Sequence, residues 1–347
     1  MGRIRSGAYP DGKKVDSEPF LCRKFDFSRN TVRQAVQELE NEGYLYRIRG
    51  KGTFVRNATP VNSRRIAMMI YDTAYMTHPV TAKVICGIDR VLTKAGFILD
   101  ILASKRSFHD ENLTRLSEAY AGFLIGCYQL DELTLQELKK LSVPHLFVKN
   151  HPKNSPVAAA RIHYEHAGFL AAEHLIRTGC RELSLIYSGE EMAISAEFCK
   201  GVFSAALESG VRLRSKNIFT IDFNRADDIV GTSSEILRRA DRPNGIVCAA
   251  DELAIPLLRE LKKHGIAVPG EISVIGCNNI NVSEMSDPPL STVALPLEKL
   301  GELAAGVLLD RILLGKEMTS FLLEPSLVLR KTTGNALSGA AVLPGTE

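Results

Sequence analysis

The sequence has 347 residues, of which 45% are apolar and 24% are charged. These values are typical of a soluble globular protein with room for two or three domains, and they exclude a wholly disordered or fibrous chain. No stretch approaches the ~18 apolar residues of a membrane span, and the N-terminus lacks the apolar segment of a secretory signal. Seven widely spaced cysteines without a CxxC pair indicate reduced thiols, so we expect a cytoplasmic protein.

The net charge of +3 is unevenly distributed along the chain. Residues 1–65 contain 14 Lys or Arg and 7 Asp or Glu, whereas the remainder contains 29 and 33. A small basic segment attached to a mildly acidic body favours a module that binds a polyanion such as nucleic acid. A basic, solvated surface is the alternative, and charge alone does not decide between the two.

Two helices are predicted near the N-terminus. Ser17 is suited to cap the first helix, which has Glu18 and Pro19 in its first turn and runs to about Lys24. After a short turn, Ser28 caps the second helix. Apolar residues recur at helical spacing along this second helix and predict its buried face, namely Val32, Ala35, Val36 and Leu39.

The opposite face of the second helix carries side chains that suit DNA recognition. Arginine and amide groups read base edges, and a hydroxyl near the helix start suits a phosphate oxygen. Two predicted strands over residues 44–48 and 53–55 enclose a glycine-rich turn with two cations, which fits a minor groove or the DNA backbone. A solvated helix and hairpin is the alternative interpretation. The candidate DNA contacts are Ser28, Arg29, Asn30, Thr31, Arg33, Gln34, Arg49, Gly50 and Lys51.

Residues 17–55, SEPFLCRKFDFSRNTVRQAVQELENEGYLYRIRGKGTFV, resemble the winged helix-turn-helix of the GntR family of bacterial transcription regulators. The resemblance implies a DNA-binding domain over residues 1–56 that places the second helix and the hairpin tip on DNA. The sequence departs from the family pattern in two places. Most of the family's first helix is missing before Ile4, so we expect either a truncated domain or a true start upstream of Met1. Pro19 stands where the family usually has an arginine that contacts a phosphate.

From Arg65 onward, short apolar runs such as 66–71 and 122–127 alternate with helical patterns. This alternation predicts an α/β fold of parallel sheets covered by helices on both faces. Roughly 270 residues are long for one such sheet, so we expect two lobes. Residues 57–64 have the composition of a linker, and residues 335–347 that of a disordered tail.

Residues 166–187 and 268–315 resemble the effector-binding domain of the LacI/GalR family, which is itself similar to periplasmic sugar-binding proteins. The resemblance implies that residues 65–334 form two α/β lobes with a small molecule bound in the cleft between them. A GntR-type head on this body is similar to bacterial arabinose-type repressors. The implied division gives lobe 1 residues of about 65–160 and 290–318, and lobe 2 residues of about 161–289 and 319–334.

Ligands of open α/β sheets bind beyond the carboxyl ends of the strands. The sequence departs from the family's sugar site at most positions: for example, Lys149 replaces an acidic residue, Phe198 an arginine and Asn278 an aspartate. The changes favour a carbohydrate-related, anionic effector over a neutral sugar, and the alternatives are a non-sugar metabolite and a loss of ligand sensing. The candidate effector contacts are Asp72, Tyr75, His78, Lys149, Phe198, Asp222, Asp251 and Asn278.

No other chemistry is indicated strongly. His163 and His166 are three residues apart in a helical pattern and could bind zinc, but HExxH is absent and a closed site needs further ligands. Solvated histidines are the favoured interpretation, and we expect neither a metal nor a cofactor. Motifs of nucleophilic catalysis are also missing, so we do not expect an enzyme.

The sequence therefore predicts a cytoplasmic transcriptional repressor. We expect a homodimer that binds a palindromic operator in double-stranded DNA and responds to a small-molecule effector. A solute-binding protein of a transporter would need a signal peptide and no basic head. An enzyme on the same scaffold would need a nucleophile or metal constellation.

Overall fold

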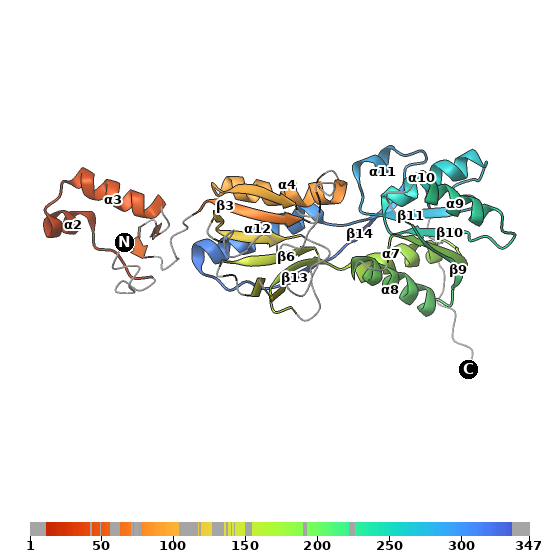
Figure 1. The fold of residues 1–347 in the computed structure, drawn as a ribbon, viewed down its shortest axis with the longest axis horizontal. Coiled ribbons are helices and arrows are strands. Elements are labelled where there is room, and N and C mark those ends of the chain that lie inside the picture. The colour runs from red at the N-terminus through yellow and green to blue at the C-terminus, as the bar shows by residue number, and fades with distance from the viewer. Residues whose placement is uncertain are drawn as a thin grey trace. The chain divides into compact units, whose positions relative to one another are not determined.

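The computed structural model divides into two compact units, which are described here one at a time (Figure 1). The first unit consists of Met1–Thr77, Lys83–Ala160 and Glu298–Phe321, and the second of His78–Ala82, Arg161–Leu297 and Leu322–Glu347. Among the described helices, none is long and apolar enough to cross a membrane. The structure describes residues 12–41, 44–48, 50–55, 63–70, 72, 76, 78–103, 117, 119–126, 135–136, 138–139, 141, 143–149, 155–189, 193–221 and 226–334.

The N-terminal head contains two helices and a hairpin. Helix α2 (Glu18–Phe25) and helix α3 (Arg29–Asn41) are followed by the antiparallel strands β1 (Leu45–Ile48) and β2 (Gly52–Val55). Ser17 precedes α2 as predicted, but its side chain makes no capping hydrogen bond. The two predicted helices and the predicted hairpin are therefore present, each within one or two residues of the expected bounds.

The head has a small apolar core of its own. Val32 and Val36, from the predicted stripe of α3, are buried with Tyr44, Leu45 and Val55 of the hairpin. Residues 12–15 lie along β2, where backbone hydrogen bonds at 2.7–2.9 Å add a strand-like edge to the hairpin. The predicted truncation of the first helix concerns residues 1–11, which lie outside the described residues.

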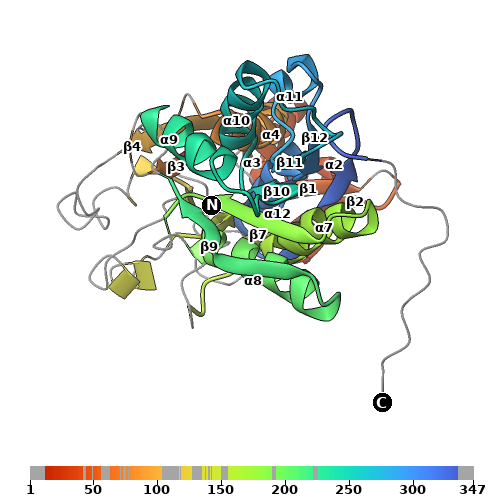
Figure 2. The ribbon, with the colours of Figure 1, turned by 90° about the vertical axis from the view of Figure 1, so that its right-hand side faces the viewer.

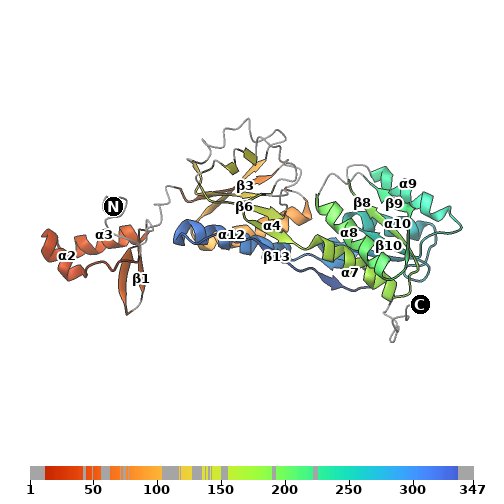
Figure 3. The same ribbon diagram turned by 90° about the horizontal axis from the view of Figure 1, so that it is seen from below.

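The first unit contains a six-stranded sheet in the order β13-β7-β6-β5-β3-β4. Helices α4 (Pro79–Lys94) and α12 (Leu297–Leu314) lie on the same side of this sheet (Figure 3). They cross closely, because a Cβ added to Gly87 or Gly301 would overlap backbone carbonyl oxygens of the other helix. The strands are β3 (Arg65–Ile70), β4 (Ile98–Ala103), β5 (Gly122–Ile125), β6 (His145–Lys149), β7 (Ala159–Ile162) and β13 (Phe321–Leu323).

The second unit contains another six-stranded sheet, in the order β14-β12-β11-β10-β8-β9. Five of its strands run parallel, and β14 is antiparallel to β12. The strands are β8 (Glu182–Tyr187), β9 (Arg212–Thr220), β10 (Gly245–Cys248), β11 (Ser273–Cys277), β12 (Ser291–Ala294) and β14 (Ser326–Val328).

Helices cover both faces of this second sheet, as the strand–helix alternation predicts. Helices α7 (Tyr164–Arg177) and α8 (Ala193–Glu208) lie on one face (Figures 1 and 2). Helices α9 (Ala226–Leu237) and α10 (Asp251–Lys263) lie on the other, and the short helix α11 (Asn281–Met285) follows β11. The α/β fold with two parallel sheets and a winged head is therefore confirmed.

The predicted lobe boundaries are wrong in two places. Residues 290–294 were expected in lobe 1, but β12 pairs with β11 in the second sheet. Residues 319–321 were expected in lobe 2, but they belong to the first unit, where β13, which begins at Phe321, neighbours β7 in the sheet. An apolar run shows that a strand exists without showing which sheet it joins. Most of the predicted linker (57–62) and the whole predicted tail lie outside the described residues.

Candidate functional site

The start of helix α3 is fixed by the predicted cap. Ser28 Oγ accepts a hydrogen bond from the Thr31 backbone N–H at 3.2 Å and lies 2.8 Å from Thr31 Oγ1. The Ser28 carbonyl accepts the first helical bond, from the Val32 N–H at 3.1 Å. The cap therefore fixes the first turn of α3, where the sequence analysis placed most of the candidate DNA contacts.

The outer face of α3 is exposed and cationic. Arg29, Asn30 and Arg33 are all exposed, while Val32 on the opposite face is 7% exposed. Within the described residues, neither Arg29 nor Arg33 forms an ion pair, so both exposed guanidinium groups can accept a new partner. Gln34 is also exposed and donates to Glu38 Oε1 at 3.2 Å within the same helix.

The hairpin presents its tip beyond the apolar core of the head. Gly50 and Gly52 have φ values of +78° and +121°, which side chains disfavour, so glycine suits this tight turn. Lys51 between them is exposed. The rings of Tyr46 and Phe54 stack at 5.7 Å across the two strands and stabilise their pairing. Arg49, also predicted at the tip, lies outside the described residues.

In the first unit, two predicted effector contacts lie at or just beyond the carboxyl ends of β3 and β6, which β5 separates in the sheet. Asp72 follows β3 and is half-buried. Lys149 is the last residue of β6, is half-buried, and has a φ of +74° that turns the chain sharply at the strand end. Tyr75 lies outside the described residues.

In the second unit, a polar group forms around Glu252, a residue that the sequence analysis did not single out. Asn278 Nδ2 donates to Glu252 Oε2 at 3.3 Å, and His78 Nε2 lies 3.5 Å from Glu252 Oε1. Asn278 follows β11 in a left-handed conformation with φ of +102°. Two of the predicted effector contacts, His78 and Asn278, therefore both lie beside the Glu252 side chain. Glu252 directly follows Asp251, which is a third predicted contact.

Asp251 itself was predicted to contact the effector, and this prediction is wrong. Its side chain is fully buried. Oδ1 accepts from Thr292 Oγ1 at 2.6 Å, and Oδ2 accepts from Ser283 Oγ at 2.6 Å and from the Ile280 N–H at 3.0 Å. Burial raises the pKa of Asp251 to about 6. The carboxylate holds the segment after β11 in place and has no surface for a ligand.

Phe198 was predicted to offer an apolar wall to the effector, and this is also wrong. Its side chain in α8 is only 2% exposed, so it belongs to the core of the second unit. A family position known from sequence alone does not show which way its side chain points once the residue type has changed. Asp222 lies outside the described residues.

The sequence analysis also missed partners that come from distant segments. Arg330 donates to Asn279 Oδ1 at 2.9 Å and to the Leu290 carbonyl at 2.8 Å, which ties the residue after Asn278 to the end of the chain. His163 and His166 are not simply solvated, because both bond to Glu324. No short-range pattern could indicate these pairs, which are separated by 51 residues for Arg330 and Asn279 and by 158 for His166 and Glu324.

Comparison with known proteins matches each part of the chain to a family. Residues 2–55 match the bacterial regulatory proteins of the gntR family, and residues 172–333 match the periplasmic binding protein-like domain. The chain is 27% identical over 373 residues to the arabinose metabolism transcriptional repressor of Halalkalibacterium halodurans, with 98% of this chain and 96% of that protein covered.

Solved structures agree with this division. A complex described as the transcriptional regulator CelR with cellobiose has a TM-score of 0.70 at 24% identity, covering 88% of this chain and 90% of that one. A LacI family transcriptional regulator from Enterococcus faecium with bound ribose has a TM-score of 0.69 at 26% identity, covering 78% of this chain and 98% of that one. The first likeness supports the fold alone, and the second also matches the effector domain in sequence.

Proposed function

Given that the chain is a transcription regulator with a GntR-family DNA-binding domain and a periplasmic-binding-protein-like effector domain, we propose that it is a repressor whose operator affinity is controlled by a small molecule. The observation that carries the DNA-binding part is the outer face of α3. Two arginines stand there without ion pairs among the described residues, on a helix whose first turn is capped. The side chains of this face do not pack in the apolar core of the head, and their charged and polar groups suit contacts with base edges and phosphates.

The effector part of the proposal rests on the strand ends of the two units. Asp72 and Lys149 in the first unit, and His78 and Asn278 in the second, are polar residues near the carboxyl ends of parallel strands. We propose these four as effector contacts. Cellobiose and ribose in the related structures make a carbohydrate the first class to test. The cation of Lys149 favours a carbohydrate that carries a negative charge.

We further propose a homodimer on a palindromic operator in the cytoplasm, without catalytic activity. Two identical heads related by a two-fold axis require symmetric half-sites in the DNA. An effector then changes operator affinity only if it binds the DNA-competent and the DNA-free conformations with different affinities.

Replacing Arg29 by alanine is expected to weaken binding to the operator by about 1–3 kcal/mol and to relax the base preference at one position of each half-site. The reason is that an exposed arginine in the first turn of α3 pairs with a guanine through two hydrogen bonds. Binding is measured on an operator recovered by selection from random duplexes, and on every single-base variant of it.

Two variants serve as controls for this measurement. Lys51→Ala removes a backbone contact, so it should weaken binding to operator and random DNA alike and lower the log–log salt slope by about one. Arg238→Ala removes an equal charge from an exposed position just after α9 and should change nothing. Equal losses on operator and random DNA for Arg29→Ala would show a phosphate contact in place of base recognition.

Replacing Lys149 by alanine is expected to weaken an anionic effector by roughly 1.5–3 kcal/mol, the contribution of a hydrogen bond to a charged group. Calorimetric titration compares sugar acids and sugar phosphates with ribose and cellobiose. Lys94→Ala is the matched control, because it removes an exposed cation at the end of α4. If a neutral sugar binds tightly and the Lys149→Ala substitution does not change its affinity, the anionic preference is contradicted. If no sugar of either class binds, carbohydrate sensing is contradicted.

A further inference from the structure

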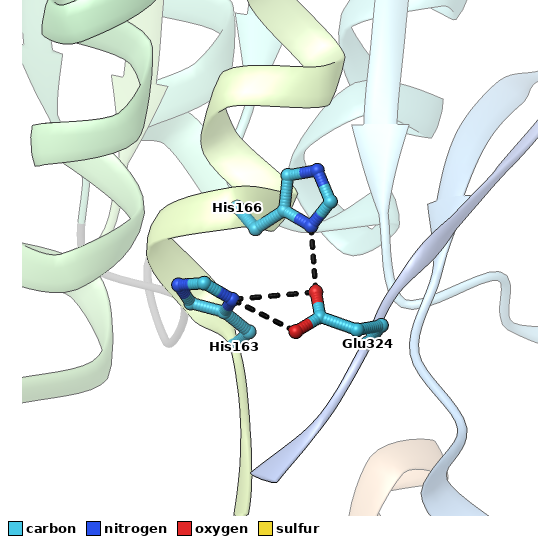
Figure 4. A group of neighbouring side chains, drawn as sticks. All are labelled: His163, His166 and Glu324. Atoms are coloured by element: carbon cyan, nitrogen blue, oxygen red, sulfur yellow. Dashed lines mark hydrogen bonds and ion pairs between the residues drawn. The ribbon is translucent and has the colours of Figure 1, made fainter.

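Two histidines and a glutamate that are distant in sequence lie together in the second unit (Figure 4). Glu324 Oε2 lies 2.6 Å from His166 Nδ1, and Glu324 Oε1 lies 3.1 Å from His163 Nδ1. Among the residues that the structure describes, these are the three His, Cys, Asp or Glu side chains whose ligand atoms gather within 4.8 Å of one another. Figure 4 shows both Nδ1 atoms directed at the carboxylate.

The backbone brings these three side chains together, through the start of α7 and a hydrogen bond to the segment that carries Glu324. His163 is the N-cap residue of α7 and makes no side-chain capping bond, so its imidazole is not used by the helix. His166 lies in the first turn of α7, three residues after His163. At this spacing, two side chains lie on the same side of a helix. The His163 backbone N–H bonds to the Leu323 carbonyl at 3.0 Å, which fixes Glu324 opposite the helix start.

We propose that His163, His166 and Glu324 form a binding site for a divalent transition-metal ion, with Zn²⁺ as the ion to test. Two imidazole nitrogens and one carboxylate oxygen are a ligand set that zinc uses, with a water molecule in the fourth position. The three groups already converge, so a small outward movement of the side chains makes room for the ion. Zinc bonds at about 2.0–2.2 Å to such ligands.

Proton balance is simple at this site. Without metal, a histidine that donates to Glu324 carries its proton on Nδ1. When the ion binds, each Nδ1 must offer its lone pair, so that proton moves to Nε2 or leaves to solvent. Both Nε2 atoms point away from the carboxylate in Figure 4 and can carry the proton.

The site is open to an ion from solution. The side chains of His163 and His166 are each 39% exposed, and that of Glu324 is 59% exposed. Hydrogen bonds from His166 and His163 hold the pKa of Glu324 below its usual range, so the carboxylate is charged at neutral pH. An exposed ion pair alone contributes little to stability, and a metal gives this arrangement a larger effect.

The position of the site gives metal binding a structural consequence. The chain passes from the first unit to the second after Ala160 and again after Phe321. His163 and Glu324 each lie three residues beyond one of these crossings. An ion held by both would join the two crossing segments by coordination bonds, in addition to the backbone hydrogen bond that already connects them.

The test is a Zn²⁺ titration of the tag-free, full-length chain at neutral pH. Calorimetry and equilibrium dialysis measure the binding. We expect one ion per chain and a rise in melting temperature with Zn²⁺ concentration. His163→Gln, His166→Gln and Glu324→Gln should each weaken binding by roughly tenfold or more, since each removes one of three protein ligands. These side chains are exposed, so the variants should fold, and circular dichroism verifies this.

Two further variants serve as controls. His264→Gln removes an exposed histidine elsewhere in the second unit, and Cys86→Ser removes an exposed thiol of the first unit; neither should change the affinity. Co²⁺ provides a second measurement, because a site of three protein ligands and water gives strong visible absorption that the Glu324→Gln variant should lose. The proposal is overturned if no ion binds, or if the bound ion is unaffected by the three ligand variants.

Discussion

Replacing Gly201 by alanine is expected to destabilise the second unit by about 3 kcal/mol. A Cβ at Gly201 in α8 would overlap the Glu165 carbonyl oxygen of α7 and lie 2.7 Å from the Phe169 backbone nitrogen. A Cβ at Gly168 in α7 would likewise overlap the Phe198 carbonyl oxygen. The obstructing atoms belong to backbone, so the helices must separate, and overpacking of this kind costs 1–3 kcal/mol or somewhat more.

Denaturant unfolding of the full chain measures this loss. Gly231→Ala is a matched control, because this helical glycine in α9 has no atom within 4 Å of the added Cβ. That variant should gain roughly 0.5–1 kcal/mol, since alanine is the better helix former and restricts the unfolded chain. Equal effects at Gly201 and Gly231 would contradict the close crossing of α7 and α8.

The head could be predicted from sequence because its determinants are local. The Ser28 cap acts on Thr31, three residues away, and the stripe that contains Val32 and Val36 repeats within one helix. The existence of most of the parallel strands was equally readable, since they are short apolar runs. Ser291–Ala294 shows the limit: no apolar run marked it as a strand, and its pairing with β11 decides which sheet it joins.

The candidate effector site was less predictable, because partners decide what a polar residue does. Lys149 lies at a strand end as expected, because the apolar run that predicts this strand ends at Lys149. Asp251 follows a strand too, yet its three donors come from segments 29 to 41 residues further along the chain. The same holds for Glu324, whose histidine partners are more than 150 residues away.

Replacing Asp251 by alanine is expected to lower the free energy of unfolding by about 3 kcal/mol at neutral pH. The substitution leaves the Ile280 N–H and the hydroxyls of Ser283 and Thr292 without an acceptor in a site that water does not reach. It also leaves a cavity, which adds to the loss. Asp287→Ala is the control: this exposed carboxylate pairs with Lys262 at the surface, and its loss should not be measurable.

The pH dependence of Asp251→Asn tests the same site with a defined sign. Burial raises the pKa of Asp251 from 3.8 to about 6, so the folded chain holds this proton more readily than the unfolded chain does. The stabilisation is complete below about pH 4 and is lost as pH rises through 6. It amounts to about 3 kcal/mol, because one pKa unit corresponds to about 1.4 kcal/mol.

Asparagine does not titrate, so the free energy of unfolding of Asp251→Asn should rise relative to that of the wild type between pH 4 and pH 7, by the same ~3 kcal/mol. Denaturant unfolding measures both free energies. A difference between the two proteins that stays constant over this range would mean that the carboxyl titrates as it does in the unfolded chain. A difference that changes in the opposite direction would mean that the hydrogen bonds from Ser283, Thr292 and Ile280 outweigh burial and lower the pKa. The first result would mean that burial and these hydrogen bonds balance at the carboxylate. The second would mean that the segment after β11, which also positions the proposed effector contact Asn278, binds the carboxylate more strongly than burial disfavours its charge.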